Sequence, residues 1–358
     1  IMNHLNQIAA QLPKYGLDAM LITSEPGEFY AIGFRGEGTV IVTAKGNYYF
    51  TDSRYIEAVE NLNLPAEVTM VGNGRGHMAL TAEVLNRCGI RKVGIEEQYL
   101  TVASFRAMTK QFPDTVELVP AGQLLTTLRA AKDEEEQAAM QEAQHITDQA
   151  FDRILNDIKP GVKECEIAAK LTYYQMLLGA EKNSFDPIVA SGPNGSMPHA
   201  VPGQKEIQEG EFVTMDFGCI YHGYCSDMTR TVCVGQPTEE MKTVYYTVLE
   251  AQEAAIAMNR AGVPGCDVHN TAMAVLEKAG YGDKMGHGFG HSLGIEIHED
   301  PRASAANREP LPLNCMISEE PGIYLPGKFG VRIEDVVLLK EDGCIDITHA
   351  PKRELIIL

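Results

Sequence analysis

Hydrophobic positions in the first 120 residues of the chain switch repeatedly between helical and strand spacing. Stretches with apolar residues every three or four positions predict helices, and short continuous apolar runs rich in Val, Ile and Tyr predict buried strands. Helices are predicted at residues 5–12, 53–61 and 77–88, and strands at 19–23, 39–43, 47–51 and 92–95. Alternating helices and strands of this length indicate a small α/β domain.

The pattern changes near residues 120–132, and we place a domain boundary between residues 125 and 126. The acidic run at 133–136 then begins a long helix that extends to about Ile158. Acidic side chains are favoured in the first helical turn by the helix dipole. A second helix is predicted to end at Leu178.

The second half of the chain contains a faint internal repeat. Residues 161–167 align with 262–268 at an offset of 101, and each copy joins a long helix, a Gly-Val turn, a second helix and strand-rich sequence. Short matches arise by chance, but this one coincides with matching predicted elements. It indicates two α+β halves related by a pseudo-two-fold axis, with a site between them.

Composition narrows the possible partners of the chain. Its 358 residues, with a net charge of −19, disfavour nucleic acid and anionic membranes, which would be repelled over most of the surface. No apolar run approaches the length of a membrane span, and the first residues resemble no signal peptide. The eight cysteines contain no CxxC pair or zinc spacing, so we expect reduced thiols in a cytoplasmic protein.

The first candidate for chemistry is a predicted hairpin. Strands at 212–218 and 224–232 flank a turn at 221–223, and Asp216 and Asp227 lie at nearly equal distances from it. The two carboxylates should therefore lie opposite or diagonal to each other on one face, while the apolar neighbours of Asp216 occupy the other face. Like charges so placed are destabilising unless a cation lies between them.

A second hairpin repeats this arrangement. Residues 320–334 fold back around the Pro-Gly-Lys turn at 326–328, and the midpoint between Glu320 and Glu334 falls on its glycine. These two glutamates should therefore also meet across the hairpin. Two such pairs in one chain are less easily attributed to chance than one.

A glycine-rich stretch between the hairpins supplies histidines. Such a stretch lets the backbone approach a ligand closely. Its histidines are His287, His291 and His298. Four carboxylates in one cleft would raise one another's pKa, and two divalent cations would balance them and activate water as a nucleophile. Four carboxylates, one imidazole and no thiolate suit Mn²⁺, Co²⁺ or Zn²⁺.

These residues resemble the pattern of the pita-bread metallopeptidases. That family comprises methionine aminopeptidases, Xaa-Pro aminopeptidases and Xaa-Pro dipeptidases (prolidases), with creatinase as a metal-free relative. The resemblance covers nearly the whole chain, and residues 52–55 are similar to the creatinase/prolidase N-terminal domain. It implies an α+β fold: a smaller α/β domain at 1–125, then a pita-bread catalytic domain at 126–358, whose pseudo-two-fold antiparallel sheet is covered by helices.

The resemblance also implies the metal ligands. The family's five ligands fall on residues of the right type, namely Asp216, Asp227, His291, Glu320 and Glu334. The expected cofactor is a pair of divalent ions per chain, Mn²⁺ first, with Co²⁺ or Zn²⁺ as alternatives.

Further roles follow from the same resemblance. Glu320 would also act as general base, and His298 and His199 match histidines that contact the scissile peptide and stabilise the tetrahedral intermediate. His287 and Arg332 match positions around the proline side of the substrate.

Two positions depart from the family pattern. Glu319 precedes the first glutamate of the second hairpin, where an apolar residue is usual, and Asn314 replaces a common turn glycine. Because side chains alternate along a strand, Glu319 should point away from Glu320.

The leading hypothesis is therefore a metallo-aminopeptidase or dipeptidase that removes the N-terminal residue from short peptides, with proline next in sequence. The alternatives are a creatinase-type amidinohydrolase, which the complete ligand set disfavours, and a non-catalytic peptide-binding module on the same fold. The N-terminal domain has no chemistry of its own. In the relatives it joins subunits and narrows the entrance to the site, so we also expect a homodimer.

Overall fold

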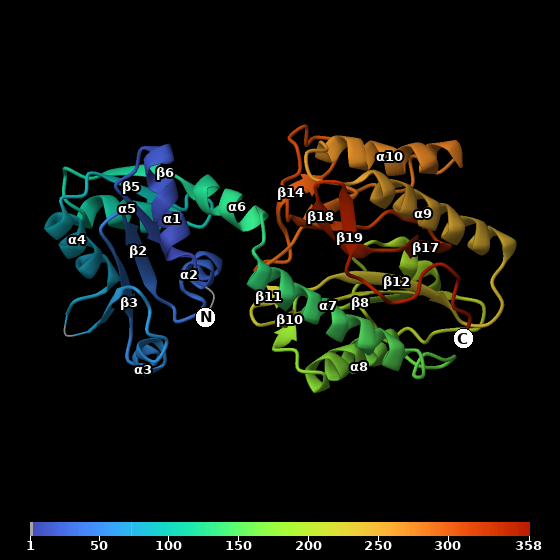
Figure 1. The fold of residues 1–358 in the computed structure, drawn as a ribbon. Helices are drawn as coiled ribbons and strands as arrows, with labels where there is room; N and C mark the ends of the chain where they lie inside the picture. The colour runs from blue at the N-terminus through green and yellow to red at the C-terminus, as the bar shows by residue number, and fades with distance from the viewer. Residues whose placement is uncertain (1–2, 73) are drawn as a thin grey trace. The chain divides into compact units, whose positions relative to one another are not determined.

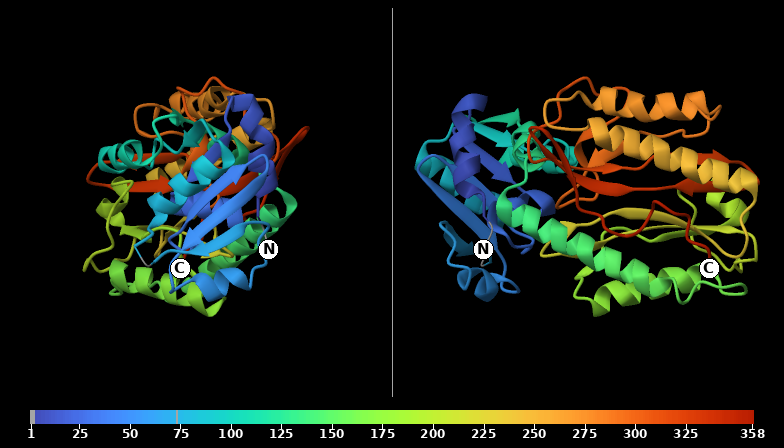
Figure 2. Two further views of the ribbon diagram at one scale, coloured as in Figure 1. Left: turned by 90° about the vertical axis from the view of Figure 1, so that its left-hand side faces the viewer. Right: turned by 45° about the vertical axis from the view of Figure 1, so that its right-hand side comes forward.

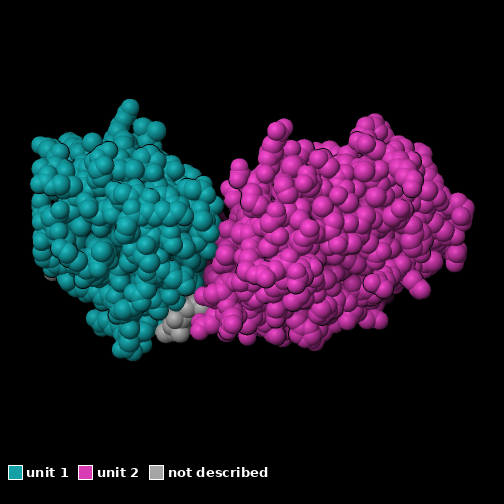
Figure 3. Space-filling view, turned by 45° about the horizontal axis from the view of Figure 1, so that its top comes forward, with its two compact units in different colours: residues 1–129 teal, residues 130–358 magenta. Residues whose placement is uncertain are grey.

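The computed structural model describes residues 3–72 and 74–358 (Figure 1, Figure 2). The chain divides into two compact units, residues 1–129 and 130–358 (Figure 3). The boundary expected from the sequence, between 125 and 126, falls inside helix α6, which spans Gly122–Ala130. Within the described residues every helix is too short or too polar to span a lipid bilayer.

Unit 1 is built on a six-stranded mixed sheet in the order β4-β3-β2-β1-β5-β6. The strands are β1 Ala19–Ile22, β2 Thr39–Thr43, β3 Gly46–Thr51, β4 Glu67–Met70, β5 Lys92–Ile95 and β6 Glu117–Pro120. The helices are α1 Leu5–Gln11, a 3₁₀ helix η1 Leu12–Tyr15, α2 Glu25–Ile32, α3 Ile56–Glu60, α4 His77–Cys88 and α5 Val102–Gln111, followed by α6. The strands predicted at 39–43 and 47–51 are confirmed as β2 and β3, which pair antiparallel as a hairpin.

Sequence periodicity missed α2, β4, α5 and β6. Helix α2 is buried from Gly27 to Ile32 without a break, so it has no polar face to produce an amphipathic pattern. Its start is fixed instead by Ser24, whose side chain accepts the Gly27 N–H. Strand β4 lacks a fully buried residue, so it has no hydrophobic signature either.

Unit 2 contains two helix pairs with strands between them (Figure 1). The pairs are α7 Glu134–Ile154 with α8 Glu164–Leu177, and α9 Glu239–Met258 with α10 Gly265–Lys278. The strands of the first half are β7 Lys182–Asn183, β8 Ile188–Ser191, β9 Phe212–Phe217, β10 Cys219–Tyr221, β11 Tyr224–Cys225 and β12 Met228–Cys233, with a 3₁₀ helix η2 at Gly192–Ser196. Those of the second half are β13 Gly290–Ser292, β14 Glu299–Ala303, β15 Met316–Glu319, β16 Gly322–Leu325, β17 Phe329–Arg332, β18 Asp335–Lys340 and β19 Gly343–Asp346.

The internal repeat is confirmed by the backbone. Gly161 and Gly262 each lie three residues before the second helix of their pair, with nearly equal positive φ angles of 87° and 86°. Their N–H groups donate to the carbonyls of Ile207 and Leu311, which hold equivalent places in the two halves. The first helix pair buries its apolar face against strands of the first half, and the second pair packs on strands of the second half together with Phe212 and Cys233 of the first.

Both predicted hairpins are also confirmed. The first turns at His222 and Gly223, which have φ angles of 46° and 80°, as a two-residue hairpin turn requires. The second turns at Gly327, with φ of 75°, and pairs Gly322 with Arg332. Local turn chemistry therefore sets the register of both carboxylate-bearing hairpins.

Candidate active site

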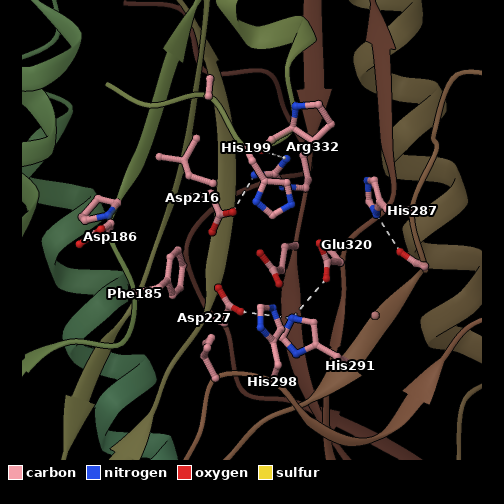
Figure 4. Close-up of a pocket in the computed structure, with 18 of the residues that line it drawn as sticks. Phe185, Asp186, His199, Asp216, Asp227, His287, His291, His298, Glu320 and Arg332 are labelled. Atoms are coloured by element: carbon pink, nitrogen blue, oxygen red, sulfur yellow. Dashed lines mark hydrogen bonds and ion pairs between the residues drawn. The ribbon is translucent and has the colours of Figure 1, made fainter. Parts of the chain in front are cut away.

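A cavity of about 570 Å³ lies in unit 2 (Figure 4). It is lined by every functional residue proposed from the sequence: Asp216, Asp227, His291, Glu320, Glu334, His298, His199, His287 and Arg332. Apolar residues line it as well, among them Phe185, Ile188, Val201 and Ile297.

The first carboxylate pair comes from the β9–β12 hairpin. Asp216 on β9 pairs with Thr229, so Asp227, two residues before Thr229, lies diagonal to it. The neighbours Met215 and Phe217 are fully buried in the hydrophobic core of their half. The alternation along β9 thus directs the carboxylate of Asp216 toward the cavity, as expected.

The second pair lies where two ladders meet. Glu319 pairs with Asp335 between β15 and β18, and Gly322 pairs with Arg332 between β16 and β17. Both pairings follow one register. Glu320 and Glu334 lie between them, and the same register places these two glutamates opposite each other. Ser318 supports this corner, because its hydroxyl donates to Oε1 of Glu320 over 3.3 Å.

His291 on β13 faces the carboxylates. Its Nδ1 donates to the Ser292 carbonyl over 3.1 Å, which directs the lone pair of Nε2 into the site. Nε2 lies 3.4 Å from Oε1 of Glu320 and 3.6 Å from Oδ2 of Asp227. One ligand atom each from Asp227, His291 and Glu334 lie within 4.8 Å of one another.

The electrostatics of this cluster favour a cation. Burial and then the neighbouring carboxylates raise the pKa of Asp227 and of Glu334 well above the ordinary range. Burial also raises the pKa of Glu320 to about 8 and lowers that of His291 to about 3. Four carboxylates beside a neutral imidazole form a set that divalent ions neutralise.

Unused hydrogen-bonding capacity supports the same conclusion. The buried Oδ1 atoms of Asp216 and Asp227 have no hydrogen-bond partner among the described residues. Buried carboxylate oxygens are normally satisfied, so orphaned ones that border a cavity indicate an absent partner. The residues therefore fit a divalent metal centre.

Arg332 connects the carboxylates to one another. Its Nη2 donates to Oδ2 of Asp216 over 2.6 Å, and its Nε donates to Oγ1 of Thr229 over 3.1 Å. The Thr229 hydroxyl donates in turn to Oε2 of Glu334 over 2.7 Å. Sequence reasoning missed Thr229, although it lies two residues after Asp227 and therefore on the same face of the strand.

Tyr324 extends this network to His287. The tyrosine hydroxyl accepts from Nη1 of Arg332 and lies 2.9 Å from Nε2 of His287, whose Nδ1 donates to the Gly288 carbonyl. Burial lowers the pKa of His287 to about 4, so the ring is neutral at neutral pH. Tyr324 was also missed, although the predicted hairpin register pairs it with Gly330 and so places it diagonal to Arg332.

The other two histidines lie on exposed parts of the cavity wall. His298 directly precedes β14, and its ring packs edge to face on His291 with ring centres 4.5 Å apart. His199 is exposed on the segment after η2. Arg302 on β14 also lines the cavity, with Nε 3.9 Å from Oδ1 of Asp300. It was missed in the sequence, although it lies only four residues after His298 and borders the same cavity.

The two departures from the family pattern have structural explanations. Glu319 points away from Glu320, as expected, and its buried Oε1 accepts from Nδ2 of Asn259 over 2.6 Å. Asn314 has a φ of 60°, a left-handed conformation that Asn tolerates better than most residues. Its Oδ1 accepts from Nζ of Lys340 over 2.9 Å.

Comparison with known proteins agrees with this geometry. Residues 138–341 match metallopeptidase family M24, and residues 4–131 match the creatinase/prolidase N-terminal domain. A Bacillus subtilis protein named an uncharacterized peptidase is 39% identical over 346 residues, which are 96% of this chain and 97% of that protein.

Solved structures of similar proteins show the same fold. The Xaa-Pro dipeptidase from Bacillus anthracis has a TM-score of 0.95 and 37% sequence identity, with 99% of each chain covered. The X-Pro aminopeptidase from Thermotoga maritima has a TM-score of 0.90 and 35% identity, and the match covers 96% of this chain and 98% of that one. Unit 2 thus has the pita-bread fold expected from the sequence, preceded by a creatinase-like N-terminal domain, and the chain is a metallopeptidase that belongs to family M24.

Proposed function

We propose that this enzyme hydrolyses the N-terminal peptide bond of short peptides whose second residue is proline, with two divalent metal ions. The observation that carries the proposal is the cavity in which four carboxylates and a neutral imidazole converge, with two buried oxygens left without partners. Relatives named for Xaa-Pro cleavage, at 35–37% identity over nearly the whole chain, support the substrate class.

The metal centre would be held by five side chains: Asp216, Asp227, His291, Glu320 and Glu334. Mn²⁺ is the proposed ion, with Co²⁺ or Zn²⁺ as alternatives, since oxygen ligands with one nitrogen suit all three. When bound, such ions acidify a water molecule and polarise the scissile carbonyl.

The remaining residues would handle protons and developing charge. Glu320, partly buried beside the cavity, would accept a proton from the attacking water and pass it to the leaving nitrogen. His298 and His199 line the cavity and would donate hydrogen bonds to the tetrahedral intermediate. Arg332 and His287 line the cavity and would border the proline side of the substrate, and Arg332 would also orient Asp216, to which its Nη2 donates.

The shape and charge of the cavity support a short substrate. About 570 Å³ accommodates a dipeptide or tripeptide, and the apolar wall formed by Phe185 and Ile297 suits an apolar side chain. The guanidinium of Arg302 borders the same space and would pair with a free C-terminal carboxylate. That pairing favours a dipeptidase over an aminopeptidase acting on longer chains.

Metal removal and a substrate panel test the proposal. Chelation should abolish hydrolysis of Leu-Pro, and added Mn²⁺ or Co²⁺ should restore it, with about two ions bound per chain by elemental analysis. Leu-Pro should be cleaved faster than Leu-Pro-Gly, and both faster than Met-Ala. Full activity in exhaustively metal-stripped protein would refute the metal mechanism. Creatine hydrolysis without peptide cleavage would favour the amidinohydrolase alternative.

A further inference from the structure

The turn between β13 and β14 presents His298 to the cavity. His291 pairs with Arg302 and Ser292 pairs with Glu299, so the register shifts at this point and residues 300–301 of β14 have no partner on β13. The His298 imidazole packs against the ring of His291. Within the described residues it makes no hydrogen bond to protein. Its position must therefore be set by the backbone on either side.

The carboxylate of Glu299, next to His298, supports this turn from the inside. Its Oε1 accepts the Glu296 N–H over 3.1 Å, and the Gly294 N–H donates to the Glu296 carbonyl over 3.0 Å. A Cβ at position 294 would lie 2.9 Å from Oε2 of Glu299, so only glycine lets the backbone pass so close to this carboxylate. The turn thus wraps around the side chain of Glu299.

Lys132 holds that carboxylate in place. Its Nζ lies 3.2 Å from Oε2 of Glu299 and donates to Oγ of Ser292 over 3.2 Å. The side chains of Lys132 and Glu299 are only 1% and 5% exposed, so water cannot substitute for either partner. One ammonium therefore binds the residue after His291 and the residue after His298.

The backbone of Lys132 is itself fixed. Its N–H donates to the Asn314 carbonyl over 3.0 Å, and its carbonyl accepts from Nε2 of Gln137 over 2.7 Å. Because these contacts anchor Lys132 at the start of α7, its side chain is a rigid support for the turn rather than a mobile surface cation.

We propose that Lys132 is a positioning residue that acts through Glu299 to hold His298 where it can stabilise the transition state. This inference rests on the proposed function, because it takes His298 to be a transition-state donor. Lys132 does not border the cavity, so its effect on catalysis must pass through another residue.

A double-mutant cycle tests the route of this effect. Lys132→Met should lower kcat for Leu-Pro at saturating Mn²⁺ by ~10–100-fold, the usual cost of losing a supporting contact. His298→Ala should lower it by ~10²–10³-fold. If Lys132 acts through His298, adding Lys132→Met to His298→Ala should cause less than about a threefold further loss. An equal loss in both backgrounds would overturn the inference.

Three further measurements keep the outcomes distinct. Bound Mn²⁺ per chain should be unchanged in Lys132→Met, and a loss would show that Lys132 acts on the metal ligand His291 instead. Lys170→Met, which removes the ion pair with Asp157 on the surface of unit 2, should keep wild-type kcat.

If Lys132→Met does not fold by circular dichroism, Glu299→Gln takes its place in the cycle. Wild-type kcat in His298→Ala would instead refute the role proposed for that histidine, and with it this inference.

Discussion

In the proposed reaction, Arg302 is the residue whose charge would bear most directly on substrate choice. Arg332 is occupied by Asp216, Tyr324 and Thr229, whereas Arg302 has, among the described residues, only a long ion pair of 3.9 Å with an exposed aspartate. A guanidinium with spare donors on a cavity wall suits a planar carboxylate. The difference between dipeptidase and aminopeptidase can therefore depend on one side chain.

Arg302→Ala should raise KM for Leu-Pro by ~10–100-fold, because a charge-assisted hydrogen bond contributes about 1.5–3 kcal/mol. Leu-Pro amide lacks the carboxylate, so its KM should barely change. Initial rates on this substrate pair give the answer, with wild type and Arg302→Lys as controls. Equal increases in KM for the two substrates would show that Arg302 does not bind the C-terminal carboxylate of the substrate.

Glu319 is an unusual buried residue with a predictable effect on stability. Burial raises its pKa to about 8, and neither its Oε2 nor Oδ1 of the neighbouring Asn259 has a hydrogen-bond partner among the described residues. The folded chain therefore holds a proton that the unfolded chain releases above the ordinary pKa of 4.5. Since the folded state binds more protons in this interval, the free energy of unfolding falls as pH rises from about 4.5 to 8.

Glu319→Gln should remove this fall in the free energy of unfolding with rising pH, because glutamine does not titrate. Its amide N–H also supplies a donor beside Asn259. The metal-free variant should exceed wild type by roughly 1–3 kcal/mol in free energy of unfolding at pH 8, and by less at pH 5. Urea unfolding at the two pH values measures the difference. Glu341→Gln, at an exposed turn, is the control and should have little effect. An advantage for Glu319→Gln that does not depend on pH would contradict the titration argument.

At the scale of elements, the two helix pairs share one connection geometry. After each first helix the chain turns through a glycine with φ near 86°, at Gly161 and Gly262, and then pairs with a strand-like segment of its own half. An added Cβ would meet no atom within 4 Å at either position. Any cost of substitution there is therefore backbone strain alone.

Gly161→Ala and Gly262→Ala should each lower the free energy of unfolding by about 1–2 kcal/mol, the cost of a left-handed conformation for a residue with a Cβ. Gly343→Ala is a matched control, because Gly343 also has open space around it but no positive φ. Chemical denaturation of the three variants should show two similar losses and one near-neutral change. A large difference between the two repeat positions would mean that the halves are not equivalent.

At the scale of the whole molecule, the proposed assembly is a homodimer. A creatinase/prolidase N-terminal domain spans residues 4–131, and the functional residues proposed here all lie in unit 2. Two-fold dimers are the commonest oligomers, and salt at physiological strength screens the charge of −19 per chain beyond about 8 Å.

Light scattering in such a buffer should give twice the chain mass of 39.2 kDa. Residues 130–358 expressed alone should be monomeric and should cleave longer peptides than the full chain does. The full chain at the same concentration is the control for both measurements. A monomeric full chain would refute the dimer. Unchanged size selectivity in the truncated protein would refute the proposal that the N-terminal domain narrows the entrance to the active site.

The sequence by itself determined the features that depend on near neighbours. Turn residues such as Gly223 and Gly327 fix the hairpin registers, and alternation along each strand then sends Asp216 to the cavity and Glu319 away from it. The helix repeat was visible for the same reason, since a glycine turn and helix periodicity are local signals. Fold and candidate ligands could therefore be predicted from spacing together with family resemblance.

Only the tertiary structure decided which residues support the ligands. Thr229 and Arg332 are 103 positions apart, and Lys132 and Glu299 are 167 apart, yet each pair is in hydrogen-bond contact. No local pattern encodes such pairs, because each arises from the packing of separate elements. A helix buried on all sides, such as α2, was missed for a related reason: without a solvent-facing side, the sequence carries no period to detect.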